Sequence, residues 1–365
     1  MADRNLELGV IGNCAIAALI DPMGEIVWSC FPRLDRDPVF CALLMNGAGK
    51  SSDGGFSIEL KDAFSSAQRY LENTAILETT LSDQVGNAIE ITDFCPRFQR
   101  FGRIYRPPTI IRRVRALSGR PIVTVKVKPR MVYGEVEPEI TRGSNHMRFI
   151  GPDHVLRLTT NAPISYILES RSFRLGEDLW FVLGDDEIVP QDLSDFGRNH
   201  LEATLDHWQT WVRGLSIPFE WQDAVIRAAI TLKLCNYEET GAIVAALTTS
   251  IPEAPGTERN WDYRFCWIRD AFFVIRVLNG LGVTRTMEDY VRFITDIVDD
   301  AQDQGIQPVY GISRESQLLE NIAQSLPGYR GMVRCASATW PMSRCRTTSM
   351  AAWCWPAPTP SSTSG

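Results

Sequence analysis

The stretch RNWDYRFCWIRD, from Arg259 to Asp270, contains two Trp, one Tyr, one Phe, three Arg and two Asp in twelve residues. Aromatic rings stack on the apolar faces of sugars, and Arg and carboxylate groups bind neighbouring hydroxyls with paired hydrogen bonds. Composition alone favours a plainer interpretation. In that interpretation Trp261, Phe265 and Trp267 belong to a core, and Arg269 forms an ion pair with Asp270 at the start of a helix.

The segments on both sides of this stretch have the periodicity of helices. Apolar residues recur every three or four positions, as they do on one face of a helix. The four series are Leu201, Leu205, Trp208, Val212 and Leu215; Trp221, Val225, Ala228, Leu232 and Cys235; Ile268, Phe272, Ile275 and Leu278; and Tyr290, Ile294, Ile297 and Val298. The first helix should end near Pro218, and Thr286 with Asp289 is similar to a capping box. Because no strand pattern interrupts these series, we expect the second part of the chain to be all-helical.

The first two hundred residues have strand patterns instead. The turn Asp21-Pro22-Met23-Gly24 predicts a hairpin between its flanking strands, and Val123, Val125 and Val127 alternate with polar residues, as in a half-buried antiparallel strand. The predicted strands are Ala15–Ile20, Glu25–Cys30, Ala75–Leu81, Ala88–Phe94, Val155–Thr159, Ile164–Leu168 and Leu179–Leu183. Many short strands joined by turns favour a β-sandwich. The predicted fold class is therefore multidomain, with an antiparallel β-sandwich followed by helices.

Composition excludes several classes of function. The chain has 365 residues, enough for two domains, and its net charge of −7 argues against a nucleic-acid partner. The N-terminal residues predict neither a signal peptide nor a membrane span, so no membrane partner is expected. Nine scattered Cys without a C-x-x-C pair are typical of reduced thiols in a cytoplasmic protein. The four His lie apart from any Cys cluster, so we expect no metal and no cofactor.

Several ordered motifs make the chain resemble glycoside hydrolase family 15, the microbial glucoamylase and trehalase family. GAIVAALTTSIPE (Gly241–Glu253), RNWDYRFCWIRDAFF (Arg259–Phe273), QPVYGI (Gln307–Ile312) and LPGYRGM (Leu326–Met332) occur in the order and spacing of that family. The N-terminal Ile11–Asp35 and Ile91–Arg97 are also similar to it. The resemblance covers residues 6 to 332. It implies a β-sandwich, a linker helix and a barrel of six inner and six outer helices, an (α/α)6 barrel.

The resemblance also implies which residues bind substrate. In the family the W-x-R-D string lies at the bottom of the pocket, where Arg and Asp hold hydroxyls of the non-reducing-end glucose. Matched position by position, Arg269 and Asp270 become substrate contacts, and Tyr263 and Trp267 become aromatic walls of the pocket. Gln307 and Pro308 match a further pocket-side motif. The expected partner is an α-glucoside oligosaccharide or disaccharide.

The character of the sequence changes after Met332. Residues 333–365 contain no Asp, Glu, Leu, Ile or Phe but three Trp and three Cys, which is not the composition of a helical barrel. If one base was lost near the Met332 codon, each codon of the original frame combines the third base of one present codon with the first two bases of the next. One consistent choice of codons up to Ala357 then encodes GPVRVGNLAYEQVQNDVYGSLVLA. That peptide is similar to the segment after LPGYRGM in the family. We therefore interpret the tail as a frameshift product and divide the chain into residues 1–195 (β-sandwich), 196–220 (linker helix), 221–332 (incomplete barrel) and 333–365 (out-of-frame tail).

A frameshift at this point has a consequence for catalysis. An inverting glycosidase needs two carboxyl groups about 6.5–9.5 Å apart on opposite sides of the anomeric carbon. The resemblance places both beyond Met332, and none of Asp262, Asp270, Glu315 and Glu320 matches the family's catalytic motifs. We therefore name no catalytic acid or base and expect this chain to be inactive.

The sequence leaves three hypotheses about function open. In the first, the intact parent is an exo-acting, inverting hydrolase of α-glucosidic bonds, of glucoamylase, glucodextranase or trehalase type. In the second, this chain is a non-catalytic truncated fragment that binds sugar weakly at most. In the third, which the R-N-W-D-Y-R and W-x-R-D strings disfavour, it is related to a disaccharide phosphorylase of similar architecture.

Overall fold

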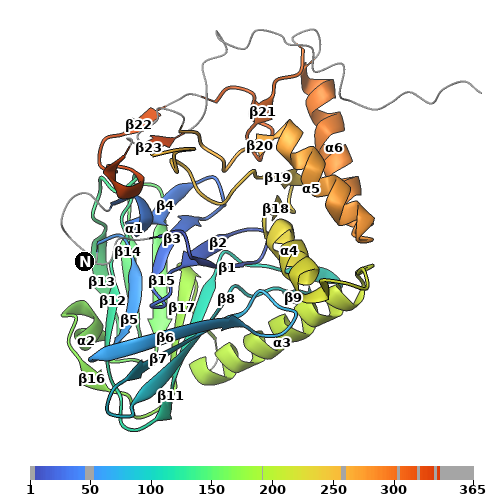
Figure 1. The fold of residues 1–365 in the computed structure, drawn as a ribbon. Helices are drawn as coiled ribbons and strands as arrows, with labels where there is room; N and C mark the ends of the chain where they lie inside the picture. The colour runs from blue at the N-terminus through green and yellow to red at the C-terminus, as the bar shows by residue number, and fades with distance from the viewer. Residues whose placement is uncertain are drawn as a thin grey trace, which may run out of the picture.

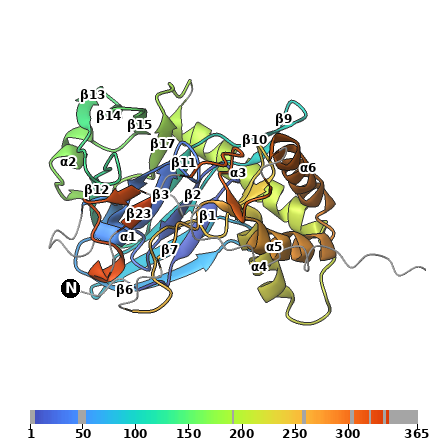
Figure 2. The ribbon, with the colours of Figure 1, turned by 90° about the horizontal axis from the view of Figure 1, so that it is seen from above.

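An antiparallel β region comes first in the chain and a helical region comes after it (Figure 1). The computed structural model describes residues 5–45, 53–190, 192–255, 260–301, 305–318 and 321–332, together with the backbone of 335–337. Seen from above, helices α4, α5 and α6 gather on one side of the strands (Figure 2). The predicted order of β structure before helices is confirmed.

The first sheet has its strands in the order β1-β2-β3-β5-β12-β16, with β4 paired to β3. The hairpin between β2 and β3 is confirmed: Gly24 N donates to Asp21 O at 2.9 Å, and the Asp21 carboxylate accepts from Met23 N and Glu25 N. The bounds are β1 Gly9–Gly12, β2 Ala17–Ile20, β3 Ile26–Phe31, β4 Asp37–Phe40, β5 Phe56–Leu60, β12 Ile122–Val127 and β16 Phe173–Arg174.

The second sheet has the order β13-β14-β15-β17-β11-β8-β7-β6, all antiparallel. Its strands are β6 Ala63–Tyr70, β7 Leu77–Asp83, β8 Ala88–Phe94, β11 Ile110–Ser118, β13 Glu139–Arg142, β14 His146–Ile150, β15 Val155–Thr160 and β17 Leu179–Asp185. A separate hairpin joins β9 Phe98–Arg100 to β10 Arg103–Tyr105. The predicted strands Ala75–Leu81 and Ala88–Phe94 correspond to β7 and β8, which pair with each other.

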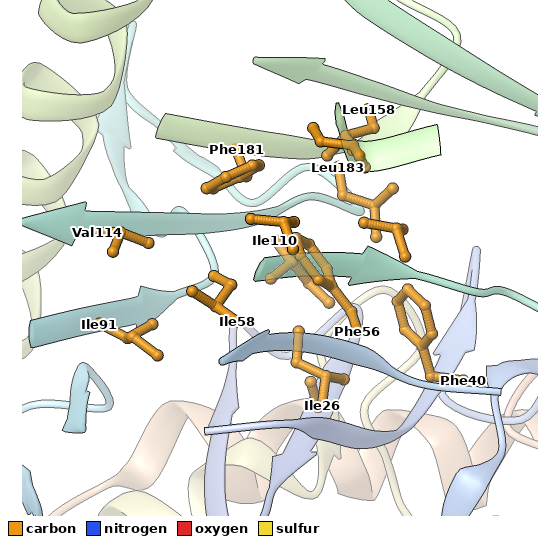
Figure 3. Packing of buried hydrophobic residues seen from close by; sticks show 14 of the residues in the cluster. Ile26, Phe40, Phe56, Ile58, Ile91, Ile110, Val114, Leu158, Phe181 and Leu183 are labelled. Carbon is orange, nitrogen blue, oxygen red and sulfur yellow. The ribbon is translucent and has the colours of Figure 1, made fainter. Parts of the chain in front are cut away.

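The two sheets share one hydrophobic core, to which both contribute buried side chains (Figure 3). Phe56 on β5 meets Phe181 on β17 edge to face, with ring centroids 5.8 Å apart. Val123, Val125 and Val127 are buried while their neighbours on β12 are half-buried, as the alternation predicted. Apolar burial of this extent is the main stabilising contribution to the β region.

The segment Ile164–Leu168 is the helix α2, so the prediction of a strand there was wrong. Backbone N–H groups of Tyr166 and Ile167 donate to Pro163 O, which closes a helical turn directly after the proline. Ile164 and Ile167 are buried and stand three positions apart, which is helical spacing. In so short an apolar run, the helical period of about 3.6 residues cannot be distinguished from the strand period of about two residues by sequence alone. A second short helix, α1, spans Ala42–Met45.

Short strand pairs interrupt the helical region, so the prediction that it is all-helical was wrong. The helices are α3 Leu193–Arg213, α4 Gln222–Leu234, α5 Ile268–Gly280, α6 Thr284–Ala301 and the 3-10 turn η2 Tyr329–Gly331. The paired strands are β18 Asn236–Tyr237 with β19 Ala242–Ile243, β20 Cys266–Trp267 with β21 Val309–Tyr310, and β22 Asn321–Ala323 with β23 Cys335–Ser337. Apart from the backbone of β23, the predicted out-of-frame tail lies outside the described residues.

Helix α3 packs against the second sheet. It begins before the predicted apolar series because the Asp192 carboxylate accepts hydrogen bonds from Ser194 N and Asp195 N. It ends at Arg213, five residues before Pro218. Gly197 permits the close approach to the sheet, since a Cβ there would lie 2.2 Å from the ring of Trp180. The helix therefore lies directly on β17.

The buried face of α4 differs from the predicted one, and the predicted cap of α6 was wrong. Trp221, expected on the inner face of α4, is 79% exposed, and the buried residues are Ala229, Ile230, Lys233 and Leu234. The buried Lys233 interrupts the apolar pattern of this face, because a lysine is usually expected on the surface. Thr286 lies inside α6 and is no cap. Its hydroxyl accepts a hydrogen bond from Lys233 Nζ at 2.9 Å.

No helix within the described ranges is long and apolar enough to cross a membrane.

Candidate functional site

The predicted site residues meet where β20 runs into α5 (Figure 1). Trp267 on β20 pairs with Val309 on β21, and Ile268 N donates to Pro308 O at 3.1 Å. These contacts place Pro308, and Gln307 before it, next to the start of α5. The structure therefore brings the two sequence motifs together, although they are forty residues apart in the chain.

Two aromatic side chains form a half-buried pair at this point. The ring centroids of Tyr263 and Trp267 are 6.3 Å apart with their planes tilted by 38°. The Trp267 indole N–H donates to Asp262 O at 3.2 Å, which fixes the orientation of the ring. Burial, with smaller contributions from Glu253 and Asp270, raises the pKa of Tyr263. Its hydroxyl therefore stays protonated at neutral pH and can both donate and accept hydrogen bonds.

Arg269 and Asp270 lie in the first turn of α5 and face solvent. Their side chains are 74% and 42% exposed, and Arg269 Nη2 lies 3.5 Å from Asp270 Oδ2. The ion pair of the plainer interpretation thus exists, but an exposed pair contributes only about 0–1 kcal/mol to stability. The helix N-terminus favours the Asp270 carboxylate. Both groups keep hydrogen-bonding capacity for a ligand.

The aromatic residues of the stretch do not all belong to a core. Phe265 is buried and fits the plainer interpretation. Trp261 and Trp267, in contrast, are half-buried, which leaves part of each indole accessible to a ligand.

Sequence reasoning missed the role of Asp262 and Arg264, which form a fully buried ion pair. Arg264 Nε and Nη2 donate to the two Asp262 carboxylate oxygens at 3.0 and 2.7 Å. Burial opposes the charge of Arg264, but Asp262 and the Tyr133 hydroxyl outweigh it and raise the guanidinium pKa well above its usual value. The available signal was the position of these charges between aromatic residues. Because buried charged groups are normally paired, charges placed among aromatic residues can indicate a buried ion pair as well as a sugar site.

The segment that follows Gln307 and Pro308 is attached to the β region. Gln307 N donates to the Tyr310 hydroxyl at 2.9 Å. Further along, Glu315 lies 3.6 Å from Arg33, whose guanidinium also donates to the Ser313 hydroxyl. Arg33 belongs to the N-terminal motif that ends at Asp35, so this motif reaches the segment beside the site.

Of the four carboxylates considered for catalysis, Asp262 is buried against Arg264, and Glu315 faces Arg33. Asp270 lies beside Arg269, and Glu320 is outside the described residues. Across the described ranges no group of three or more His, Cys, Asp or Glu side chains could hold a metal ion.

A second buried ion network joins the β region to the helices. Glu238, which comes directly after β18, accepts from Arg97 Nη1 and Nη2 at 2.9 and 2.8 Å, and from Lys233 Nζ at 2.6 Å. Burial raises the pKa of Glu238, but the two cations outweigh it and hold that pKa far below its usual range. Arg97 Nε also donates to His207 Nε2 on α3 at 3.0 Å. Burial, and then the charge of Arg97, lowers the pKa of His207 to about 4.

Sequence comparisons match both parts of the chain to known proteins. The family model for glycosyl hydrolases family 15 matches residues 221–334, and the model for the trehalase-like N-terminal region matches residues 3–172. The chain is 30% identical to the trehalase of Mycolicibacterium smegmatis, with 88% of this chain and 52% of that protein covered. It is 32% identical to the trehalase of Mycobacterium tuberculosis (85% and 49% covered) and 32% identical to trehalase 1 of Sulfolobus acidocaldarius (88% and 54% covered).

The chain thus spans about half the length of the curated relatives it matches. Its two matched regions occur in the order of the β and helical parts of the structure, and together they cover more than half of the sequence. The helical part of the chain therefore matches glycosyl hydrolases family 15, and the β part matches the trehalase-like N-terminal region.

Proposed function

We propose that the start of α5 is the terminal-glucose site of a trehalase-type hydrolase. The observation that carries this proposal is the half-buried Tyr263–Trp267 pair next to the exposed Arg269 and Asp270. The aromatic faces would stack on the apolar face of a glucose ring, while the guanidinium and carboxylate bind neighbouring hydroxyls. Gln307 and Pro308 would flank the same ring. The names of the relatives support trehalose as the first substrate to test.

The whole protein's proposed reaction is inversion at an α-glucosidic bond at the non-reducing end of the substrate. That reaction needs one carboxylic acid to protonate the leaving oxygen and one carboxylate to activate water on the opposite face of the sugar. Two of the carboxylates considered above are already engaged, because Asp262 pairs with Arg264 and Glu315 faces Arg33, and we assign neither role to them. We propose that the 365-residue chain binds the sugar without cleaving it, and that α4, α5 and α6 are the first helices of an (α/α)6 barrel.

Equilibrium binding of trehalose to the 365-residue chain tests the proposal. Wild type should bind trehalose, and Arg269→Ala and Asp270→Ala should each weaken binding by roughly 10-fold or more, as expected for loss of a charged hydrogen-bonding partner. Arg285→Ala is the matched control, because Arg285 on α6 is also exposed and lies 3.9 Å from Asp289. Equal affinities for wild type, Arg269→Ala and Asp270→Ala would refute the site. Turnover that requires inorganic phosphate would favour the phosphorylase hypothesis.

A further inference from the structure

The buried Arg264 connects the candidate site to a loop of the β region. Its Nη1 donates to Arg36 O at 2.8 Å, and its Nη2 donates to the Tyr133 hydroxyl at 2.9 Å. The guanidinium also lies over the rings of Tyr133 and Trp28, at 5.4 and 5.9 Å from their centroids. Apart from Asp262, these partners all come from the first 133 residues. The side chain is thus held by both parts of the molecule.

The loop that presents Tyr133 has an unusual backbone. Val132, Tyr133 and Gly134 have φ values of 52°, 54° and 86°, three consecutive residues in the left-handed region. That conformation is costly for the β-branched Val132. The Asp37 carboxylate holds the loop, since its two oxygens accept from Val132 N and Tyr133 N at 2.7 Å each. The surrounding structure therefore determines where the Tyr133 hydroxyl lies.

A continuous series of hydrogen bonds leads from this loop to the aromatic pair of the site. Tyr133 accepts from Arg264, Arg264 donates to both carboxylate oxygens of Asp262, and the Asp262 carbonyl accepts the indole N–H of Trp267. Asp262 Oδ1 also accepts from Arg264 N at 3.1 Å, which fixes the backbone between Asp262 and Arg264, including Tyr263. None of Tyr133, Arg264 and Asp262 needs to touch a sugar to affect the site.

We propose that Tyr133 is a positioning residue for the candidate sugar site and that it acts on Trp267 through Arg264 and Asp262. This inference rests on the proposed function for its link to sugar binding. It assigns the β region a direct part in shaping the site, since residues bound to a ligand are held in place by the hydrogen bonds behind them.

Tyr133→Phe removes the hydroxyl and keeps the ring over Arg264, so the variant should fold. Tyr70→Phe is the matched control. The Tyr70 hydroxyl also makes two hydrogen bonds in the β region, with Val10 N at 2.7 Å and Val10 O at 3.1 Å. A thermal melt checks that both variants are folded. The removal of a whole charged partner, as in Arg264→Ala, is less informative because it leaves Asp262 buried without its cation.

Two readouts on the 365-residue chain separate the inference from the proposed function. The first is the indole N–H signal of Trp267 in protein with 15N-labelled tryptophan, identified by its loss in Trp267→Phe. It should shift and exchange faster in Tyr133→Phe but not in Tyr70→Phe. The second is trehalose affinity, which should fall roughly 3- to 10-fold in Tyr133→Phe alone, the range for one hydrogen bond.

The outcomes are distinct. An unchanged Trp267 signal in Tyr133→Phe overturns the positioning role, whatever the sugar result. A shifted signal with unchanged trehalose affinity also overturns it, because the site then tolerates the displacement. If wild type binds no trehalose, the proposed function fails, and the Trp267 signal alone decides whether Tyr133 positions that side chain.

Discussion

Glu238→Gln should destabilise the protein by about 3–5 kcal/mol, the usual cost of removing one partner from a buried ion network. Glu238 is the anion shared by two nearly buried cations: the side chains of Arg97 and Lys233 are 4% and 6% exposed, and that of Glu238 is 16% exposed. Glutamine has a similar shape and keeps one acceptor oxygen, but it carries no charge. Both cations would then remain buried without their common counter-charge.

The cost should appear as a lower free energy of unfolding in urea, monitored by tryptophan fluorescence and far-UV circular dichroism at pH 7. Glu239→Gln is the control, because Glu239 is the exposed neighbour and accepts one hydrogen bond from the Tyr237 hydroxyl. The control should lie within about 0.5 kcal/mol of wild type, as surface substitutions usually do. A loss below about 1 kcal/mol in Glu238→Gln would show that the network does not hold the β region to the helices.

Three further predictions concern the core, pH and catalysis. Phe56→Ala should cost about 3–5 kcal/mol of unfolding free energy, measured by urea titration, because Phe56 is fully buried between the sheets; a loss under about 1 kcal/mol would contradict the packing in Figure 3. Stability should fall as the pH drops from 6.5 towards 4, because unfolded His207 takes up a proton in that window while the folded residue stays neutral. The low pKa of Glu238 acts in the same direction below about 4.5, where the unfolded carboxyl becomes protonated. In His207→Gln, which keeps an acceptor for Arg97, the melting temperature should depend less on pH between pH 6.5 and 4 than in wild type. If the pH dependence of the melting temperature is the same in both proteins, His207 is excluded as its cause. The 365-residue chain should release no glucose from trehalose or maltose above a blank without protein, and sustained release would refute the absence of catalytic carboxylates.

Much of the β region could be predicted from sequence because local rules specify it. The turn at Asp21–Gly24 sets one hairpin, and the alternation around Val125 sets which face of β12 is buried. The same rules do not decide Ile164–Leu168, where five residues fit either period and the preceding proline begins a helical turn. There the contacts with the rest of the fold select the helix.

The candidate site was predictable only in part. The motif proposes Tyr263, Trp267, Arg269 and Asp270 as site residues, which stays a prediction, and the structure brings Pro308 next to the start of α5 through the pairing of β20 with β21. The roles of Arg264 and Lys233 were not predictable, because Tyr133, a partner of Arg264, and Thr286, a partner of Lys233, lie far away in the chain. A charged residue is taken for a surface residue until its partner is known.

The most direct test of the central claim is trehalose hydrolysis by the protein in which the proposed lost base near the Met332 codon is restored. That protein should hydrolyse trehalose, and its kcat/KM should fall about 10- to 150-fold in Arg269→Ala, which corresponds to the loss of one charged hydrogen-bonding partner. Arg285→Ala should leave kcat/KM unchanged. Wild-type kcat/KM in Arg269→Ala would contradict the assignment of the glucose site to the start of α5 and leave Arg269 and Asp270 as a surface ion pair.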